Sequence, residues 1–551
     1  MRSILLLLLF TIISGNTLFA QTVLSDTEKL ATASRVWGFL KYYHPEVARG
    51  NMDWDAQLIN ILPEIESAAT KEELSAVYLT WIKSLGEVKK CRSCREKPES
   101  GYFTKNFDLG WTQNSKLFTP ELSQQLKFIE ENRNQKKNHY VTADRISDYA
   151  VITNEKKYTN FEYPDRNYRL LALFNYWNVI EYFFPYKYQT NQNWNDVLTE
   201  MIPKFKNAEN AGEYHLAMLE LVTKIDDSHA LFNSNVLKKQ LGSKSIPTRQ
   251  NMIGNKLIVT GFWNDSLAAI NNLQPGDEIV RINNQSVNEI VQQNLKYSIG
   301  STQKRKTNNA IMRALLCNND SMLLVTKRNG KIIDRKVKLY TFKEMNSGKT
   351  REFHKYKILE NNIGYINMPL LNAKDAEEIM QKVKHCNALI INVRNYPKFI
   401  FRRISRHLNP AKKEFVKIIK PDLTYPGKFI WKEEKTTGIK NDDYFKGKVI
   451  LLVDGNTQSR AEYTVMSFQT APNVTTIGNQ TAGADGNVSL FEFAGGYRTS
   501  MSGLGIFYPD GTETQRKGVK IDIEVQPTQQ GIIEGRDEIL EKAIEFAKLR
   551  I

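Results

Sequence analysis

Cysteine is scarce in this chain, which has only four among 551 residues. Cys91 and Cys94 form a Cys-x-x-Cys pair, while Cys317 and Cys386 stand far apart. Four cysteines are too few for a scaffold held together by disulfides, and a zinc ribbon would need a second pair. The βαβ pattern that surrounds a thioredoxin-like motif is also missing. We expect Cys91 and Cys94 to close a small disulfide loop, with two free thiols as the alternative.

Long apolar runs are also missing after the N-terminus, so the sequence predicts no membrane-spanning helix there. At the start, Arg2 precedes a short apolar run at 4–13, and Ala20-Gln21 is typical of a cleavage site. We interpret residues 1–20 as a secretory signal peptide, and no cysteine follows it to take a lipid. We expect the mature protein to be exported, to the periplasm or the extracellular medium, without stable membrane insertion.

Motifs for nucleic acids, metals and phosphates are absent as well. The formal charge is +16, but Lys and Arg are scattered and form only short clusters such as 304–306. Since no nucleic-acid motif accompanies them, we expect no nucleic-acid partner and read the charge as solubility and attraction to acidic surfaces. The sequence contains no cluster of metal ligands and no phosphate-binding loop, so we expect neither a metal nor an organic cofactor.

Aromatic residues recur in two N-terminal segments that lie 140 residues apart. Each segment predicts an aromatic helix, a proline-bearing loop, a second amphipathic helix and a third helix near 73–84 or 213–224. Carried onward, the same offset places His229 where the first copy has Lys89. The matching pairs are Trp37 and Trp177, Tyr42 and Tyr182, Pro45 and Pro185, Asn51 and Asn191, Trp54 and Trp194, Leu58 and Leu198, and Pro63 and Pro203.

Short strands replace helices from about residue 246, and strands then alternate with helices from about residue 353. The segment 273–283, Leu-Gln-Pro-Gly-Asp-Glu-Ile-Val-Arg-Ile-Asn, resembles an element of PDZ domains, which bind extended peptides at a sheet edge. Further on, the pattern predicts strands at 363–368 and 388–393, with helices at 374–384 and 537–548. Such alternation indicates an α/β layered domain.

We therefore expect a multidomain α+β chain: N-terminal helical repeats, a PDZ-like β domain and an α/β layered catalytic domain. The expected division is a signal peptide at 1–20, a helical repeat with a mixed linker at 21–165, a second helical repeat at 166–240, the PDZ-like domain at 241–345 and the catalytic domain at 346–551.

The strongest chemical signal lies between residues 447 and 523. An apolar run at 448–453 ends in a Gly/Asn turn that leads to Ser459 and Glu462. This order predicts a strand, a turn and a helix that begins at Ser459, and glycine-rich segments follow at 478–486 and 508–511. A hydroxyl at such a helix start can act as an acyl-transfer nucleophile, although Ser459 and Glu462 can also simply cap the helix.

Over residues 363–525 this succession resembles the C-terminal (tail-specific) processing serine peptidases and their tricorn-core relatives. These families place the nucleophile in a Ser-x-Ala-Glu segment and follow it with a Gly-x-x-Thr-x-Gly turn. The processing peptidases have a lysine directly after this turn, but Ala484 stands there in this chain, so a Ser–Lys dyad is not supported. The tricorn-like branch instead uses a histidine in a Ser-His pair ahead of the PDZ domain, where this chain has Ser228 and His229.

The resemblance implies a role for each of these residues. Ser459 is the expected nucleophile, His229 takes its proton, and Ser228 helps to hold the imidazole ring. The relatives have a glutamate as the third member, at the position that Gln515 occupies here. Glu513 lies nearby and can substitute for it; otherwise Gln515 can still accept a hydrogen bond without supplying charge. The alternative for Glu513 is a solvated strand residue.

An oxyanion hole needs two preorganised N–H donors. By resemblance, one is the amide of Arg460. The other comes from Asn395 or Tyr396 in the loop after the buried strand, or the hole is incomplete in the free enzyme. The relatives have glycines in this loop, whereas here Pro397 has no N–H to donate. The resemblance also implies that the Arg460 side chain binds an acidic or C-terminal carboxylate group of the substrate.

Taken together, the sequence predicts an exported serine peptidase that cleaves peptides or unfolded proteins, near their C-terminal ends, through an acyl-enzyme. Two alternatives remain: a non-catalytic peptide-binding protein on the same scaffold, and a carrier that holds apolar ligands in a similar α/β fold. The oligomeric state does not follow from the sequence.

Overall fold

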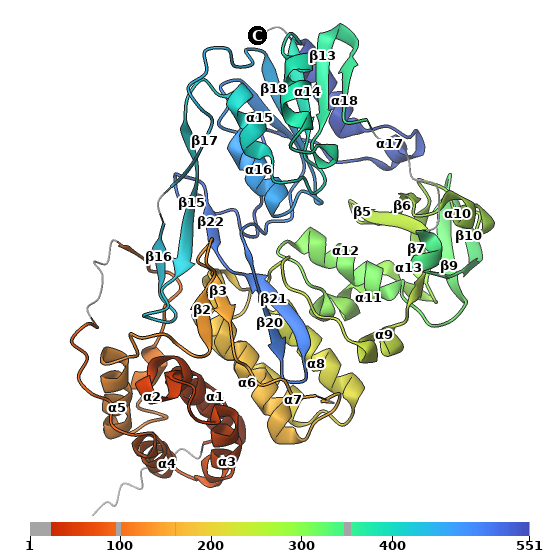
Figure 1. Cartoon of the computed structure of the whole chain (residues 1–551). Helices are drawn as coiled ribbons and strands as arrows, with labels where there is room; N and C mark the ends of the chain where they lie inside the picture. The colour runs from red at the N-terminus through yellow and green to blue at the C-terminus, as the bar shows by residue number, and fades with distance from the viewer. Residues whose placement is uncertain (1–23, 95–100, 160, 347–353, 433, 550–551) are drawn as a thin grey trace, which may run out of the picture.

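The computed structural model describes residues 24–94, 101–159, 161–346, 354–432 and 434–549. The expected signal peptide at 1–20 lies outside these residues. Figure 1 shows N-terminal helices at one end, a C-terminal part with a central sheet at the other, and a smaller sheet beside them. Within the described ranges, no helix is both long and apolar enough to cross a membrane.

Two helical units form the N-terminal part. In each unit two tryptophans exchange hydrogen bonds from indole N–H to backbone carbonyl: Trp37 with Trp54 at 3.0 and 3.1 Å, and Trp177 with Trp194 at 2.8 and 3.0 Å. These bonds satisfy the buried indoles and lock each aromatic helix against the next one. The helices are α1 (Asp26–Tyr43), α2 (Pro45–Ala48), α3 (Trp54–Ser67) and α4 (Lys71–Ser84) in the first unit, and α6 (Arg166–Phe183), α7 (Trp194–Lys206), α8 (Ala211–Thr223) and α9 (Asn235–Leu241) in the second.

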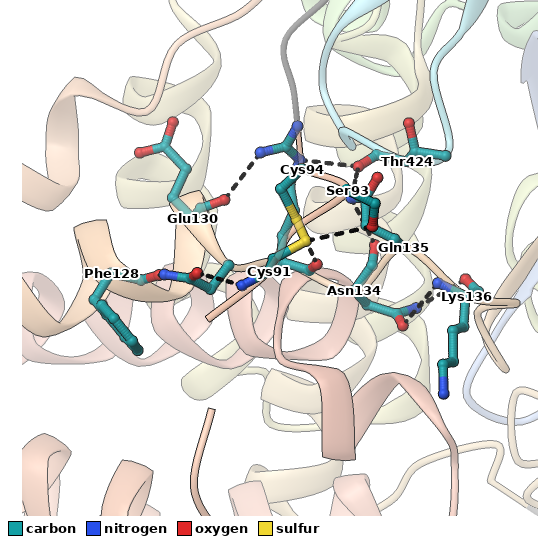
Figure 2. The surroundings of a disulfide bond; sticks show 11 residues. Cys91, Ser93, Cys94, Phe128, Glu130, Asn134, Gln135, Lys136 and Thr424 are labelled. Atoms are coloured by element: carbon teal, nitrogen blue, oxygen red, sulfur yellow. Dashed lines mark hydrogen bonds between the residues drawn. A yellow bond between two sulfur atoms is a disulfide. The ribbon is translucent and has the colours of Figure 1, made fainter. Parts of the chain in front are cut away.

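Between the two units the chain carries a disulfide and a few short elements. Cys91 and Cys94 are joined with an S–S distance of 2.00 Å, which confirms the expected loop disulfide. Figure 2 shows the bridge beside Gln135, whose side chain donates a 3.0 Å hydrogen bond to the carbonyl of Thr424 in the C-terminal part. The elements here are β1 (Tyr102–Phe103), α5 (Pro120–Glu131), β2 (Val141–Ala143) and β3 (Ala150–Ile152).

A small sheet with its own apolar core follows the helical units. Its strand order is β10-β9-β7-β6-β5, so β5 lies at an edge and can accept a further strand on its outer side. Helix α12 lies along this part of the sheet and contacts β5. The elements are β4 (Lys244–Ser245), β5 (Thr248–Ile253), β6 (Lys256–Phe262), α10 (Asp265–Ile270), β7 (Glu278–Ile282), β8 (Gln285–Ser286), α11 (Val287–Asn294), α12 (Gln303–Ala314), β9 (Ser321–Arg328), β10 (Lys331–Lys338), β11 (Tyr340–Thr341) and α13 (Phe342–Met345).

A six-stranded sheet, in the order β12-β13-β14-β18-β19-β23, is the centre of the C-terminal part. All its neighbouring pairs are parallel except β12 with β13. Apolar side chains of α14, α15 and α16 cover one face, and those of α18 cover the other. The elements are β12 (Tyr356–Leu359), β13 (Ile363–Asn367), α14 (Asp375–Val383), β14 (Ala388–Asn392), α15 (Phe401–Leu408), β18 (Lys448–Val453), α16 (Arg460–Phe468), β19 (Val474–Gly478), β23 (Ile523–Glu524), α17 (Gln529–Ile533) and α18 (Glu538–Lys548).

Further strands connect this sheet to the helical units. Phe493 stacks on Tyr176 of α6, with ring centroids 4.9 Å apart, and Figure 1 shows β20 and β21 running along the second helical unit. One apolar core therefore contains residues of both parts. The strands are β15 (Lys413–Pro421), β16 (Phe429–Trp431), β17 (Lys435–Thr437), β20 (Val488–Phe493), β21 (Tyr497–Ser502) and β22 (Gly505–Phe507).

Candidate active site

Ser459 lies in a sharp turn between the buried strand β18 and helix α16. Its backbone has φ of 57° and ψ of -120°, a conformation that an L-residue rarely adopts. Holding a serine there costs about 1–3 kcal/mol, which the surrounding structure must supply. The turn resembles the nucleophile elbow of hydrolases, in which a strained strand-to-helix turn exposes the serine hydroxyl. The amide of Arg460, at the first position of α16, has no partner within the helix and points its partial positive charge toward the same region.

Glu462 fixes the glycine-rich loop beside Ser459. Its fully buried carboxylate accepts hydrogen bonds from the Thr481 hydroxyl at 2.5 Å, the Gly483 amide at 2.9 Å and the Ala484 amide at 3.1 Å. It also accepts from the Ser459 amide at 3.1 Å, while that amide bonds the Ala484 carbonyl at 2.9 Å. The glutamate that the sequence marked as a helix cap therefore joins the nucleophile turn to the loop.

His229 lies in the loop after α8, with its side chain only 7% exposed. Its Nδ1 is 2.8 Å from the Ser502 hydroxyl, its carbonyl accepts a 2.6 Å hydrogen bond from Ser500, and its Nε2 is buried without a hydrogen-bond partner among the described residues. Burial lowers the pKa of His229, and the nearby carboxylate of Asp227 raises it and partly offsets this effect. The ring is therefore neutral near neutral pH and has a free nitrogen that can accept a proton.

Hydrogen bonds bring the histidine and serine segments together. Gln458, the residue before Ser459, donates a 3.2 Å bond to the carbonyl of Ser228, the residue before His229. Ser228 donates a 3.3 Å bond to the carbonyl of Ala482, in the loop that Glu462 holds. Within the described ranges, no hydrogen bond joins the Ser459 hydroxyl directly to His229. Catalytic hydrogen bonds often tighten only when substrate binds.

The structure separates the other expected members of the triad. Ser228 bonds Ser301 through its amide, at 2.7 Å, and its hydroxyl accepts from the Ser301 amide at 2.8 Å, so it holds the loop. Glu513 accepts from Lys105 at 3.1 Å and from the Tyr188 hydroxyl at 2.9 Å, which directs it toward the helical part. Gln515 lies closer to the histidine, because its side-chain amide is 3.4 Å from Asp227.

The expected oxyanion loop lies beside the nucleophile turn. Thr457 donates a 3.1 Å hydrogen bond to the carbonyl of Val393, and Arg394 forms two 2.7 Å bonds with Asp537. These contacts anchor the loop that carries Asn395 and Tyr396, both of which are exposed. The roles of Asn395, Tyr396 and the Arg460 amide as oxyanion donors stay predictions.

A cleft of about 410 Å³ opens at Ser459. Its lining combines apolar and aromatic side chains with polar and charged ones, and the Arg460 guanidinium lies 5.0 Å from the Tyr396 ring centroid. Asp485 also lines the cleft; burial raises its pKa well above the ordinary value, with Glu462 adding to this effect. A larger cavity of about 700 Å³ lies between β5, α12 and the loops at 454–456 and 479–481. Both cavities are large enough to hold peptide side chains.

A strained serine at a helix start, at a cleft and close to a buried histidine segment, is an arrangement typical of serine hydrolases. Residues 362–525 match Peptidase family S41. The chain therefore carries a domain of this peptidase family and is a serine peptidase.

Solved structures of mature CPAF share the fold at low sequence identity. Mature CPAF complexed with lactacystin matches with a TM-score of 0.55 at 11% identity, over 70% of this chain and 98% of that chain. The photosystem II D1 C-terminal processing protease matches with a TM-score of 0.39 at 14% identity, over 69% and 99%. No curated protein matches the sequence.

Two residues near His229 were missed by sequence reasoning. Asp227 stands only two positions before the histidine, so its place in the Asp-Asp-Ser-His run was an available signal. Ser502 is far away in the chain and ends an ordinary strand, β21, so nothing in the local sequence points to it.

Proposed function

We propose that the protein is an exported serine peptidase that cleaves peptide or unfolded-protein substrates near their C-terminal ends. Ser459 attacks the scissile carbonyl and forms an acyl-enzyme, and His229 takes the serine proton and returns it to the leaving amine. The observation that carries this proposal is the strained backbone of Ser459 at the first turn of α16, at the mouth of the 410 Å³ cleft.

The free edge of β5 supports a preference for chain ends. The larger cavity runs between this edge and α12 and reaches the loop that precedes Ser459. An extended peptide that adds to β5 in the manner of a PDZ ligand would therefore lie close to the nucleophile turn. Arg305 of α12 lies 3.4 Å from the side-chain oxygen of Gln458, which links the two regions. Arg460 lines the cleft, and we expect its guanidinium to bind an acidic group of the substrate.

Export is supported by the N-terminal apolar run and by the Cys91–Cys94 disulfide, because disulfides persist in oxidising compartments. Fractionation of cells that express the full chain, with N-terminal sequencing of the product, tests this part. Removal of residues 1–20 is expected, and recovery of the uncleaved chain in the cytoplasm would contradict export.

Covalent labelling with a fluorophosphonate probe, read by intact mass, tests the catalytic proposal. Wild type should gain one adduct, Ser459→Ala none, and His229→Ala should label about 100-fold more slowly or less. Ser147→Ala is the matched control, because Ser147 also lines the cleft and its loss should leave labelling unchanged. A peptide library digested by wild type then reports whether cleavage falls near C-terminal ends and beside acidic groups.

A non-catalytic peptide-binding protein is the second candidate. It is favoured by the missing hydrogen bond between Ser459 and His229 within the described residues, and by an oxyanion loop without glycine. Absence of labelling in wild type, even with peptide added, together with saturable binding of a fluorescent peptide, would establish this function instead.

A further inference from the structure

Asp227 is a buried carboxylate that no lysine or arginine neutralises within the described ranges. Its side chain is fully buried, and the one basic group near it within the described ranges is His229, whose Nδ1 is 3.9 Å from Oδ1. The adjacent Asp226 differs, because it pairs with Lys306 and lies 3.7 Å from Arg516. Burying a charge without a partner is costly, so the isolated carboxylate at 227 needs an explanation.

The hydrogen bonds of Asp227 lead to the histidine ring. Its Oδ2 accepts from the Ser502 amide at 2.6 Å, and its Oδ1 accepts from the Ser502 hydroxyl at 3.1 Å and the His229 amide at 3.0 Å. An ionised carboxylate can only accept, so the Ser502 proton points toward Asp227. The Ser502 oxygen must then accept from His229, at 2.8 Å, through a protonated Nδ1. This direction leaves Nε2 without a proton, which is the tautomer that a general base requires.

We propose that Asp227, acting through the hydroxyl of Ser502, is the carboxylate that positions His229 and stabilises its charged form. Both are positioning residues, since in the proposed mechanism only the ring contacts the reacting atoms. The inference rests on the proposed function and supplies its missing third member. Gln515 occupies the position where the relatives have a glutamate, and its side-chain amide is 3.4 Å from Asp227. The negative charge that the glutamate would supply is therefore supplied by Asp227.

The proton balance of the acylation step follows from this arrangement. As the Ser459 oxygen bonds the substrate carbonyl carbon, its proton moves to Nε2 and the carbonyl π pair moves to oxygen. The ring becomes an imidazolium with Nδ1–H still bonded to Ser502, and the Asp227 charge compensates it. When the tetrahedral centre collapses, the C–N bond breaks and the Nε2 proton goes to the leaving amine.

The tautomer of wild-type His229 gives the first test. Long-range ¹H–¹⁵N correlation on protein labelled with [¹⁵N]histidine, assigned by loss of the signal in His229→Gln, reports which nitrogen carries the proton. At mildly alkaline pH we expect Nδ1 protonated and Nε2 bare. A protonated Nε2 would overturn the proposal without any appeal to enzymatic activity.

The Asp227→Asn variant gives the second test, with Asp226→Asn as the matched control. Asp227 is the charged neighbour that raises the pKa of His229, so its loss should lower the measured pKa by about one unit or more. Asp226 is already neutralised by Lys306 and Arg516. In Asp226→Asn, the pKa of His229 should therefore change by less than about half the shift seen in Asp227→Asn, even if stability falls. Equal pKa values in wild type and Asp227→Asn would overturn the inference.

The kinetic effect should fall on kcat rather than on KM. We expect Asp227→Asn to lose about 10²–10⁴ in kcat, as when the carboxylate of a serine–histidine pair is removed. If that variant does not fold, the kcat values of Ser502→Ala and Ser502→Thr are compared instead. Only Thr keeps a hydroxyl between the His229 ring and the Asp227 carboxylate, so kcat should be higher in Ser502→Thr. Equal kcat in these two variants would refute the relay. If the NMR tests give the expected tautomer and pKa shift but the probe does not label Ser459, the role of Asp227 toward His229 stands and the proposed peptidase function is refuted.

Discussion

Glu462 shows how a single residue ties fold to chemistry in this protein. It is fully buried, yet it accepts hydrogen bonds from both the nucleophile turn and the glycine-rich loop. Burial raises its pKa from 4.5 to about 7, even though its hydrogen bonds act in the opposite direction. The cost of burying a charge therefore outweighs the gain from four donors.

This raised pKa predicts a pH-dependent stability. Between pH 4.5 and about 7 the folded protein retains a proton on Glu462 that the unfolded chain releases. The stability contributed by this group is therefore fully present below about pH 4.5 and is lost as the pH rises to about 7, a change of about 3 kcal/mol. Glu462→Gln removes this dependence. Relative to wild type, the variant should gain about 2.5 kcal/mol in free energy of unfolding between about pH 5 and about pH 8.

Urea unfolding at the two pH values measures the difference. The variant should be less stable than wild type at the lower pH, because its amide faces backbone donors. Glu545→Gln is the control, since that side chain is 64% exposed and its loss should leave the pH dependence as in wild type. Parallel pH curves for wild type and Glu462→Gln would show that the buried carboxylate is ionised throughout.

Among the individual residues of the site, the sequence predicted those that lie in a recognisable local pattern and missed those that do not. Ser459 follows from the strand–turn–helix pattern around it, and the structure places it at the start of α16. Asp227 and Ser502 meet only because β21 packs against the loop after α8, a contact between positions 275 residues apart. No propensity or spacing encodes such a meeting, since it depends on how the whole chain folds.

Among the elements, the glycine-rich loop at 478–486 is closely packed against neighbouring backbone. Gly483 has φ of +64°, and a Cβ there would lie 2.9 Å from the backbone of Arg516. Gly496 also has a positive φ, of +77°, but a Cβ there would meet nothing within 4 Å. The pair separates the cost of backbone conformation from the cost of close packing.

Gly496→Ala should lower the free energy of unfolding by about 1–2 kcal/mol, which is the cost of the left-handed conformation alone. Gly483→Ala should lower it by about 1–3 kcal/mol more, because the Arg516 backbone must move. Because the adjoining amide of Ala484 bonds Glu462, the displaced loop should also slow probe labelling of Ser459. Urea unfolding and labelling rates measure the two effects; equal losses in both variants would show that the loop relaxes freely.

Regular elements were more accessible to sequence reasoning than their pairing. The predicted helices at 374–384 and 537–548 and the buried strand at 388–393 coincide with α14, α18 and β14 to within a residue. Periodicity and apolar runs carry this information. The docking of β20 and β21 on the second helical unit was not anticipated, because their apolar side chains show which face is buried but not against what.

For the whole molecule, the shared core predicts which parts unfold together. Residues of both helical units and of β15, β16 and β20–β22 belong to one apolar cluster, whereas the β5–β10 sheet has its own. The helical units and the catalytic strands should therefore lose structure as one cooperative body, and the small sheet separately.

Tyr176→Ala tests this division, because the Tyr176 ring stacks on Phe493 across the boundary between helical and catalytic parts. Deleting a buried aromatic ring costs about 3–5 kcal/mol. Hydrogen exchange by mass spectrometry across a urea series should show peptides of the helical units and of β20–β21 losing protection at the same lowered midpoint, with the β5–β10 midpoint unchanged. Ile279→Ala, in the core of the small sheet, should give the reverse pattern. Tyr176→Ala could instead lower the midpoint of the helical peptides but leave β20–β21 protected. In that case β20 and β21 fold without the helical units, and the shared core is only a contact between two independently folding parts.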